Sequence, residues 1–395
     1  IYIKDLISKG ANYMLKAFTL RNYKNFKEEI TIDFENIRDY SFQKDCISDG
    51  IITKMLICGR NATGKTNLGK ALLDVKDVLY GTFECPYDPF LLNADSDEKT
   101  AFFEYRFQFG DTELCYEYLK EYRGLAYEKL EINGISIFEC DFEKGKYNFD
   151  HLNYVNAETI NTEYYLENVK SCNDIPGSRF AFLKWTLDHI ALDENSVLLK
   201  LTDYVNGMSR ITADYREFSL LSNTVEEQNF YQLLEKNHNL QHFEDFLNVM
   251  GIECKLKLKR MLNKQRNLYF VYDRMIPFLE NASSGILMLT ELYYRILSND
   301  ENVSFLYLDG IDSFFHYEAA EKMLLFLKET YPKCQIILTS HNTRLLTNKL
   351  MRPDCLFILS EKGSLTSFCN ATQRELKEEH NLEKMYISGE FEKYE

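Results

Sequence analysis

The sequence predicts an α/β fold with a mixed sheet, an antiparallel β subdomain and a helical insertion. Three observations lead to this prediction. A short apolar run, Met55–Cys58, precedes a glycine-rich turn and a helical pattern. Residues 100–132 alternate between apolar and polar side chains in segments separated by turns, as in an antiparallel meander. Two more apolar strands, 303–309 and 335–342, follow a long stretch with helical spacing.

Composition limits the class of protein. A chain of 395 residues is long enough for one large domain with insertions, or for two domains. No run of 18 apolar residues occurs, so no membrane span is expected. The ten cysteines are scattered without C-x-x-C spacing, which argues against a zinc site or a redox pair and favours the reducing cytoplasm. The net charge of −15 argues against broad, non-specific binding of nucleic acid.

The chain divides into three predicted parts. Residues 14–149 form an N-terminal lobe, with a strand pair, the glycine-rich turn and the meander. Residues 150–250 form a helical insertion, in which the segment from Glu226 to Met250 has the clearest helical spacing. Residues 251–395 form a C-terminal lobe. The first thirteen residues do not resemble a signal peptide, and Met14 looks like a natural start, so we expect an extension before it.

The glycine-rich turn is the most specific signal in the sequence. It fits the phosphate-loop pattern G-x-x-x-x-G-K-[ST], and the glycines let backbone N–H groups point at phosphate oxygens. The lysine supplies a cation for the β and γ phosphates, and the threonine hydroxyl can ligate Mg²⁺. The sequence therefore predicts a site for ATP and Mg²⁺ formed by Gly59, Arg60, Asn61, Ala62, Thr63, Gly64, Lys65, Thr66 and Asn67.

Three further segments complete the predicted site. Ser283 or Ser284, followed by Gly285, can cap a helix that continues to Ile296. Asp309 ends an apolar strand, where phosphate-loop enzymes place a second group for Mg²⁺. His341 ends the next apolar strand, which we expect to neighbour the strand of Asp309, so that both side chains lie at the same sheet edge as the phosphates.

One basic cluster stands out in this acidic chain. Lys255, Lys257, Lys259, Arg260, Lys264 and Arg266 lie on a predicted hairpin. Two interpretations stay open. The lysines can form a solvated strand face that deters edge pairing, or the cluster can contact DNA or RNA.

The order phosphate loop, Ser-Gly helix, strand-Asp and strand-Ser-His resembles the ATP-binding-cassette (ABC-type) ATPase heads, a class of P-loop NTPases. Asn61 and Asn67 in the loop, and the opening segment Phe18–Phe26, are similar to the SMC and RecF branch. The segments 282–285 and 312–316 and the tail 380–391 resemble bacterial abortive-infection and overcoming-lysogenization-defect-like AAA family ATPases of anti-phage defence. The resemblance covers nearly the whole chain from Met14.

The resemblance implies a role for each residue. Lys65 and Thr66 bind phosphate and Mg²⁺, and Asp309 holds the Mg²⁺ through water. Ser283, Ser284 and Gly285 contact the γ-phosphate of ATP held by a second protomer. His341 senses that phosphate, and Asp312 lies in a loop that crosses the dimer interface.

One position departs from the family, because Gly310 replaces the glutamate that usually follows the strand aspartate and acts as general base. We therefore expect slow hydrolysis. The alternative is that His341, Asp312 or a partner residue positions the water.

These features predict an ATP-dependent switch that forms a homodimer or a higher homo-oligomer and controls a separate effector, a nuclease or toxin, in bacterial anti-phage defence. An alternative is an SMC- or RecF-like ATPase that acts on DNA in repair or maintenance. A transporter's nucleotide-binding subunit is opposed by the large insertion and the SMC-like first strand. An autonomous nuclease is opposed by the lack of a visible acidic cluster of the TOPRIM kind.

Overall fold

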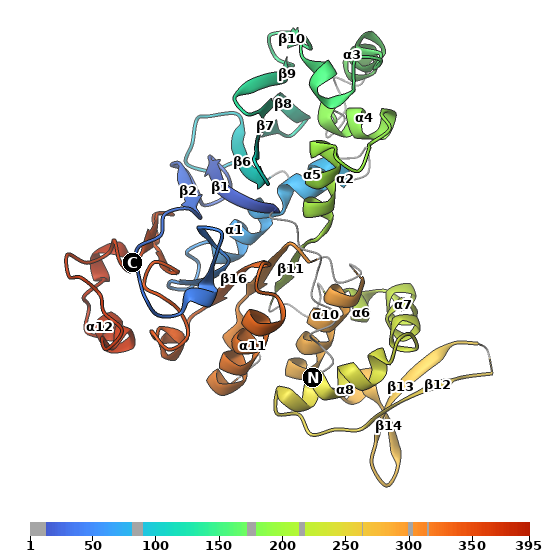
Figure 1. Cartoon of the computed structure of the whole chain (residues 1–395), viewed down its shortest axis with the longest axis vertical. Coiled ribbons are helices and arrows are strands. Elements are labelled where there is room, and N and C mark those ends of the chain that lie inside the picture. Colours follow the sequence, from blue (N-terminus) through green and yellow to red (C-terminus); the bar gives the residue numbers. More distant parts are fainter. Residues whose placement is uncertain are drawn as a thin grey trace.

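Two large sheets dominate the computed structural model (Figure 1). It describes residues 13–80, 90–171, 179–212, 218–262, 264–298, 303–313 and 316–395. The first twelve residues lie outside this part, and so do residues 81–89, which belong to a segment (80–98) that the sequence predicts to be a loop. None of the helices that the structure describes is long and apolar enough to cross a lipid bilayer.

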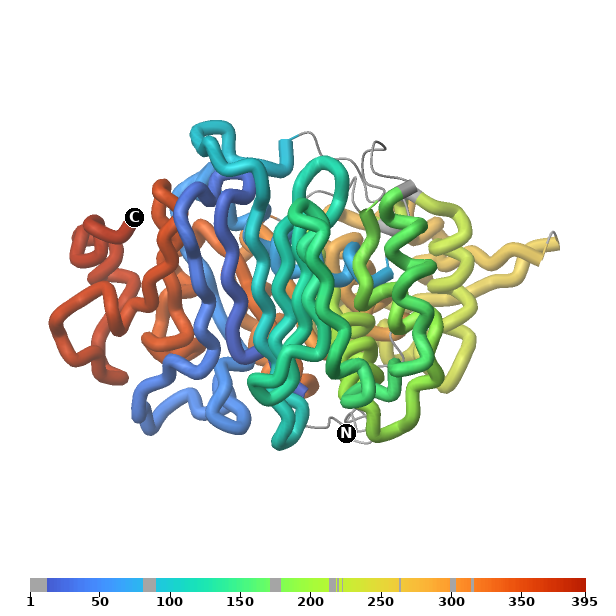
Figure 2. Tube along the Cα trace, turned by 90° about the horizontal axis from the view of Figure 1, so that it is seen from above, coloured from blue at the N-terminus to red at the C-terminus, as the bar shows by residue number. Residues whose placement is uncertain are grey.

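The first sheet has seven antiparallel strands in the order β10-β9-β8-β7-β6-β1-β2. Its strands run side by side across the view in Figure 2. Inward-facing residues of β6, β7 and β8 alternate with partly exposed ones, as the sequence pattern predicts. The strands are β1 (Tyr13–Arg21), β2 (Ile30–Asp33), β6 (Ala101–Phe109), β7 (Thr112–Glu121), β8 (Gly124–Ile132), β9 (Ile135–Asp141) and β10 (Lys146–Asn148).

The second sheet has six strands in the order β11-β15-β16-β5-β17-β18, all parallel except β18. Its central strands are buried along their whole length, which is why they appear as continuous apolar runs. The strands are β5 (Lys54–Cys58), β11 (Met208–Thr212), β15 (Phe305–Asp309), β16 (Gln335–Ser340), β17 (Leu356–Leu359) and β18 (Leu365–Ser367). A short hairpin, β3 (Ile47–Ser48) and β4 (Ile51–Ile52), precedes β5.

The α/β class with a mixed sheet and an antiparallel β subdomain is therefore confirmed. Helices α1 (Lys65–Leu72) and α2 (Asp74–Tyr80) follow the phosphate loop, and α1 lies between the two sheets in Figure 1. Six apolar residues of this segment form one buried helical face, as the helical pattern after the turn predicts: Leu68, Ala71, Leu72, Val75, Val78 and Leu79. Helices α10 (Ser284–Ser298) and α11 (Tyr317–Thr330) lie on the other side of the parallel sheet.

Residues 150–250 are mostly helical but contain one strand of the parallel sheet. Strand β11 pairs in parallel with β15, beside the strand of Asp309. The helices are α3 (Thr162–Ser171), α4 (Phe182–His189), α5 (Val197–Asn206), α6 (Ser219–Ser222), α7 (Thr224–Leu234) and α8 (Asn239–Val249). The division of the chain into three domains stays a prediction.

The prediction of continuous helical spacing from Glu226 to Met250 is wrong at its centre. Asn237 and His238 have φ angles of 45° and 62°, in the left-handed region. An α-helix of L-residues cannot continue through that backbone conformation. The segment is therefore two helices, α7 and α8, which both pack on the three-stranded sheet of β12 (Leu256–Arg260), β13 (Arg266–Val271) and β14 (Met275–Pro277).

Two buried polar groups join the layers. The side-chain amide of Gln335 donates to the carbonyl of Leu15 (2.9 Å) and accepts from its backbone N–H (2.7 Å). The hydroxyl of Tyr204 also donates to Gln335 (2.7 Å). This single amide therefore connects β16 of the parallel sheet, β1 of the antiparallel sheet and α5. Two short helices, α9 (Phe278–Asn281) and α12 (Leu382–Ile387), complete the fold.

The second polar group is the carboxylate of Glu128 on β8, which is completely buried. It accepts hydrogen bonds from the backbone N–H groups of Phe182 (2.6 Å) and Leu183 (3.0 Å) and from the hydroxyl of Tyr116 (2.9 Å). These N–H groups belong to the first turn of α4, where they have no partner within the helix. Glu128 thus caps α4 and attaches the insertion to the antiparallel sheet.

Candidate functional site

The glycine-rich turn lies between β5 and α1 and encloses the side chain of Lys65. The ammonium group of Lys65 donates to the carbonyls of Gly59 (2.8 Å) and Arg60 (2.7 Å). Burial is the largest influence on this lysine and lowers its pKa, while the nearby carboxylates of Asp309 and Asp312 act in the opposite direction. The loop therefore holds one partly desolvated cation, which favours an anionic ligand.

Both motif glycines are required by the local packing. Gly64 has a φ of 102°, and a Cβ atom there would lie 2.1 Å from the side chain of Asn25. A Cβ atom at Gly59 would lie 2.5 Å from the carbonyl oxygen of Leu359. The Asn25 amide donates to the carbonyl of Thr63 (3.0 Å) and its oxygen accepts from Asn67 (2.8 Å). The segment that follows β1, which contains Asn25, therefore fixes the shape of the phosphate loop.

The carboxylate of Asp309 meets the end of this loop. The hydroxyl of Thr66 donates to one carboxylate oxygen at 2.5 Å. The hydroxyl of Thr339 donates to the other oxygen at 2.7 Å, and the hydroxyl of Thr212 lies 3.4 Å from the first. Two oxygen groups that suit Mg²⁺ therefore converge from β15 and α1, and two neighbouring strands orient the carboxylate.

The described residues contain no group of three or more His, Cys, Asp or Glu side chains that could hold a metal ion. The convergence of Thr66 and Asp309 thus provides two oxygen ligands only. That is the usual arrangement for Mg²⁺ bound together with substrate phosphates, because the ion retains water and takes further ligands from the phosphates.

The predicted neighbourhood of Asp309 and His341 is confirmed at the level of the strands, since β15 and β16 are adjacent and parallel. His341 is exposed, and its backbone N–H donates to the carboxylate of Asp312 at 3.2 Å. Gly310 donates its N–H to Thr339 (2.8 Å) and has a φ of 66°. The position that usually carries the general base therefore has a left-handed backbone, which disfavours a side chain.

The Ser-Gly segment lies at the start of α10. Ser283 caps α10, with its hydroxyl 3.4 Å from the N–H of Ile286. This helix packs against α7, α8 and β11. No hydrogen bond between described residues joins Ser283, Ser284 or Gly285 to the loop residues. One protomer thus brings together Lys65, Thr66 and Asp309 but leaves the Ser-Gly segment outside that group.

Arg60, Asn61 and Ala62 form the exposed outer part of the loop. The guanidinium of Arg60 forms an ion pair with Glu395 at 3.1 Å. Ala62 has a φ of 65°. These three residues are at the phosphate loop as predicted, but their side chains face solvent in this conformation.

Sequence reasoning missed four residues of the site. Asn25 and Thr212 lie in segments that carry no phosphate-loop signal. The hydroxyl of Tyr307 donates to the backbone carbonyl of Lys65 at 2.5 Å, and Thr339 connects Asp309 with Gly310. Tyr307 and Thr339 lie on the two strands that the sequence did predict. Their polar side chains within apolar runs were the available signal.

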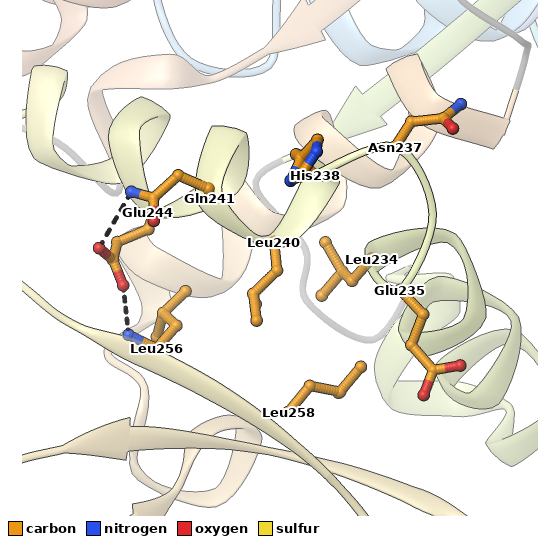
Figure 3. Close-up of a pocket in the computed structure, with 9 residues that line it drawn as sticks. All are labelled: Leu234, Glu235, Asn237, His238, Leu240, Gln241, Glu244, Leu256 and Leu258. Atoms are coloured by element: carbon orange, nitrogen blue, oxygen red, sulfur yellow. Dashed lines mark hydrogen bonds between the residues drawn. The ribbon is translucent and has the colours of Figure 1, made fainter.

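A separate cavity of about 680 Å³ lies between α7, α8 and β12 (Figure 3). Four leucines and several polar side chains line it, and Leu256 and Leu258 point into it from β12. None of its lining residues belongs to the predicted ATP site. The residues are Leu234, Glu235, Asn237, His238, Leu240, Gln241, Glu244, Leu256 and Leu258.

Comparison with known proteins agrees with the motifs. The model of the family described as "AAA domain, putative AbiEii toxin, Type IV TA system" matches residues 180–347. That range includes the Ser-Gly segment, Asp309 and His341. No curated protein matches the sequence.

Solved SMC heads show distant similarity. The SMC head domain from Thermotoga maritima is 15% identical, with 90% of this chain and 98% of that chain covered, at a TM-score of 0.45. The Smc head domain of Pyrococcus furiosus, solved bound to the C-terminal domain of ScpA, is 13% identical over 96% of this chain and 100% of that chain, with a TM-score of 0.48. The Smc head domain of Pyrococcus yayanosii is 12% identical over 95% and 99%, also with a TM-score of 0.48. The family match confirms the resemblance that the motifs predict: this chain is similar to P-loop ATPases of the AAA type represented by the putative AbiEii toxin family.

Proposed function

We propose that the chain binds Mg-ATP and hydrolyses it slowly. The observation that carries this proposal is the contact between Thr66 and Asp309, because it places two oxygen ligands at the mouth of a loop that encloses Lys65. The contact joins the threonine that follows the phosphate-loop lysine to a strand-end aspartate 243 residues away, which is the pairing that Mg²⁺ coordination at a phosphate loop needs.

Thr66 and Asp309 are the residues that would hold Mg²⁺, and the ion would supply charge stabilisation at the phosphates. The chain's own groups do the rest. Backbone N–H groups of the loop and the first turn of α1 bind phosphate oxygens. Lys65 adds a positive charge next to them. Thr339 keeps the Asp309 carboxylate in one orientation, so that it is ready before the ligand arrives.

Calorimetry tests the site directly. Lys65→Ala removes the charge that faces the phosphates, and Mg-ATP affinity should fall at least about tenfold, on the order of 1.4 kcal/mol. The matched control is Lys70→Ala on the exposed side of the same helix, which removes the same charge and should bind ATP like the wild type. Unchanged affinity in Lys65→Ala would overturn the assignment.

We further propose that ATP joins two protomers and that this cytoplasmic dimer, or a higher homo-oligomer, controls a separate effector. The support is that Ser283–Gly285 form no hydrogen bond with the phosphate loop among the described residues of one protomer, so this segment can contact nucleotide held by another. The motif residues account for nucleotide chemistry alone. The resemblance to abortive-infection ATPases points to anti-phage defence and to a nuclease or toxin as the effector.

Expression in bacteria tests the effector proposal. The chain alone should be harmless, because it supplies the switch and not the toxic activity. Toxicity of the isolated chain that is abolished by a substitution outside the ATP site would contradict it. A variant with Lys65→Ala serves as the comparison, since it should be equally harmless alone.

A further inference from the structure

The sheet formed by β12, β13 and β14 has two chemically different faces. Its β12–β13 hairpin projects from the body of the protein (Figures 1 and 2). On β12, Leu256 and Leu258 point into the cavity beside α8 (Figure 3). Because successive side chains of a strand point to opposite faces, the preceding Lys255 and the strand residues Lys257 and Lys259 lie on the other side.

The face with the lysines contains no carboxylate on any of the three strands. Lys257 is paired across the sheet with Tyr269, and Lys259 with Asn267. The ammonium of Lys259 lies 5.9 Å from the centre of the Tyr269 ring. Residues 255–277 include seven basic residues and one acidic residue, a net charge of +6 in a chain whose total is −15. The positive charge is therefore concentrated on this projecting element.

The basic side chains on the two faces of this sheet differ in whether they form ion pairs within the chain. Arg260 and Arg266, on the side of the leucines, both form ion pairs with Glu235 at 2.9 Å. Lys255, Lys257 and Lys259 form no salt bridge with any residue that the structure describes. Lys255 and Lys257 are exposed at the surface, and Lys259 is partly exposed. These three cations therefore remain available to a ligand from outside the chain.

We propose that this face, with Lys255, Lys257, Lys259, Asn267 and Tyr269, binds the phosphate backbone of single-stranded nucleic acid. Alternate residues of a strand are about 6.7 Å apart, so the lysines form a regular row of cations. A row of cations beside an aromatic ring is the arrangement that binds a single strand, because phosphates contact the cations and bases stack on the ring. This proposal goes beyond the proposed ATP site, and the binding does not require ATP.

Protection against edge pairing does not explain this arrangement. Lysines that protect an edge interfere with backbone pairing at the outer strand. Here the outward N–H of Leu256 already donates to the carboxylate of Glu244 at 2.6 Å. The lysines lie on the face of the sheet, next to Asn267 and Tyr269. An acidic protein would satisfy the charges but would not need the aromatic ring and the amide beside them.

Fluorescence anisotropy with a labelled single-stranded oligonucleotide of about 20 nucleotides tests the proposal without ATP. The triple variant Lys255→Gln, Lys257→Gln, Lys259→Gln should bind at least about tenfold more weakly than the wild type. A plot of log affinity against log salt concentration has a negative slope. Its magnitude should decrease by about 2 in the triple variant, since three phosphate contacts are lost and each contributes about 0.7. The matched control changes three exposed lysines elsewhere, Lys349→Gln, Lys362→Gln and Lys377→Gln, and should bind like the wild type.

Further measurements distinguish single-stranded nucleic acid from other ligands of this face. Tyr269→Leu should bind the oligonucleotide about tenfold more weakly than the wild type, because it removes the stacking surface. Equal affinity of the two triple variants would overturn the proposal, and so would tighter binding of duplex than of single strand. Competition by polyglutamate as strong as by oligonucleotide would show a site for acidic protein instead. Calorimetry should show that the triple variant of Lys255, Lys257 and Lys259 binds Mg-ATP like the wild type, which would establish that it is folded. Lys65→Ala should keep oligonucleotide binding, so failure here is distinct from failure of the ATP site.

Discussion

The hydroxyl of Thr339 donates to the carboxylate of Asp309 at 2.7 Å and accepts the backbone N–H of Gly310 at 2.8 Å. One side chain on β16 therefore fixes both the proposed magnesium ligand and the residue that follows it. Thr339 is fully buried, so water cannot replace either bond.

This relationship gives the first prediction. Thr339→Val keeps the shape of the side chain but leaves the Gly310 N–H without its partner and Asp309 with one donor fewer. The free energy of unfolding should fall by about 1–3 kcal/mol, and Mg²⁺ should increase ATP affinity less than in the wild type. Calorimetry with and without Mg²⁺ measures the second effect. Thr339→Ser retains the hydroxyl and should resemble the wild type; equal Mg²⁺ dependence in both variants would contradict the proposed role.

A second prediction concerns assembly. ATP should increase the mass of the wild type in sedimentation, and Ser283→Arg should prevent that increase, because a long cation at the start of α10 blocks the facing protomer. Ser298→Arg places the same side chain at the other end of the same helix and should dimerise normally. The same ATP-dependent mass for the wild type and Ser283→Arg would disprove the composite site.

A third prediction concerns the missing general base at Gly310. General-base catalysis commonly contributes about 10²–10⁴-fold, so wild-type hydrolysis in single turnover should be slow and Gly310→Glu should be faster. The backbone at φ 66° disfavours any side chain, at a cost of about 1–2 kcal/mol. Gly310→Gln therefore serves as the control, since it carries the same strain without a base.

Two outcomes would contradict a missing base at position 310. Equal rates for Gly310→Glu and Gly310→Gln would show that a carboxylate there does not help. Fast wild-type turnover that is abolished by His341→Ala would place the water-positioning group at the residue that follows β16 instead.

A fourth prediction concerns pH. Burial raises the pKa of Glu128 to about 7. The folded state therefore binds more protons than the unfolded state between the ordinary glutamate pKa and about pH 7. The free energy of unfolding should therefore decrease by an amount on the order of 3 kcal/mol as the pH rises through this window. Above about pH 7 this contribution should no longer change.

Denaturant unfolding at pH 5 and pH 7 measures the effect. Glu128→Gln should be less stable at both values, because it loses an acceptor for the first turn of α4, but its stability should change little with pH. Glu131→Gln on the same strand should keep the wild-type dependence. A steep dependence that survives in Glu128→Gln would assign the titration to another group.

The sequence predicted the parts of the site that depend on local order. The phosphate loop and the strands of Asp309 and His341 were recognisable because a short apolar run, a glycine pattern and a strand-end acid are adjacent in the chain. The contacts of Asn25 with Thr63 and of Tyr307 with Lys65 depend on how distant segments pack. Periodicity within a short window cannot reveal them.

Two elements show the same limit. Strand β11 has only five residues, and it is a strand because β15 offers a partner edge. The break between α7 and α8 follows from two left-handed residues, Asn237 and His238. Asparagine and histidine are enriched at such positions, yet both also occur inside helices. The apolar spacing on either side concealed the interruption.

The bonds of Lys65 have a consequence for ligand selection. The ammonium group is already held by two neutral carbonyls of its own loop, from Gly59 and Arg60. An incoming molecule gains from this cation only by exchanging those acceptors for better ones. Anionic phosphate oxygens achieve that, because they add an attraction between opposite charges that a neutral carbonyl cannot supply. A nucleoside brings no anionic oxygen to the exchange, so the loop itself favours phosphorylated ligands before any contact with the base is made.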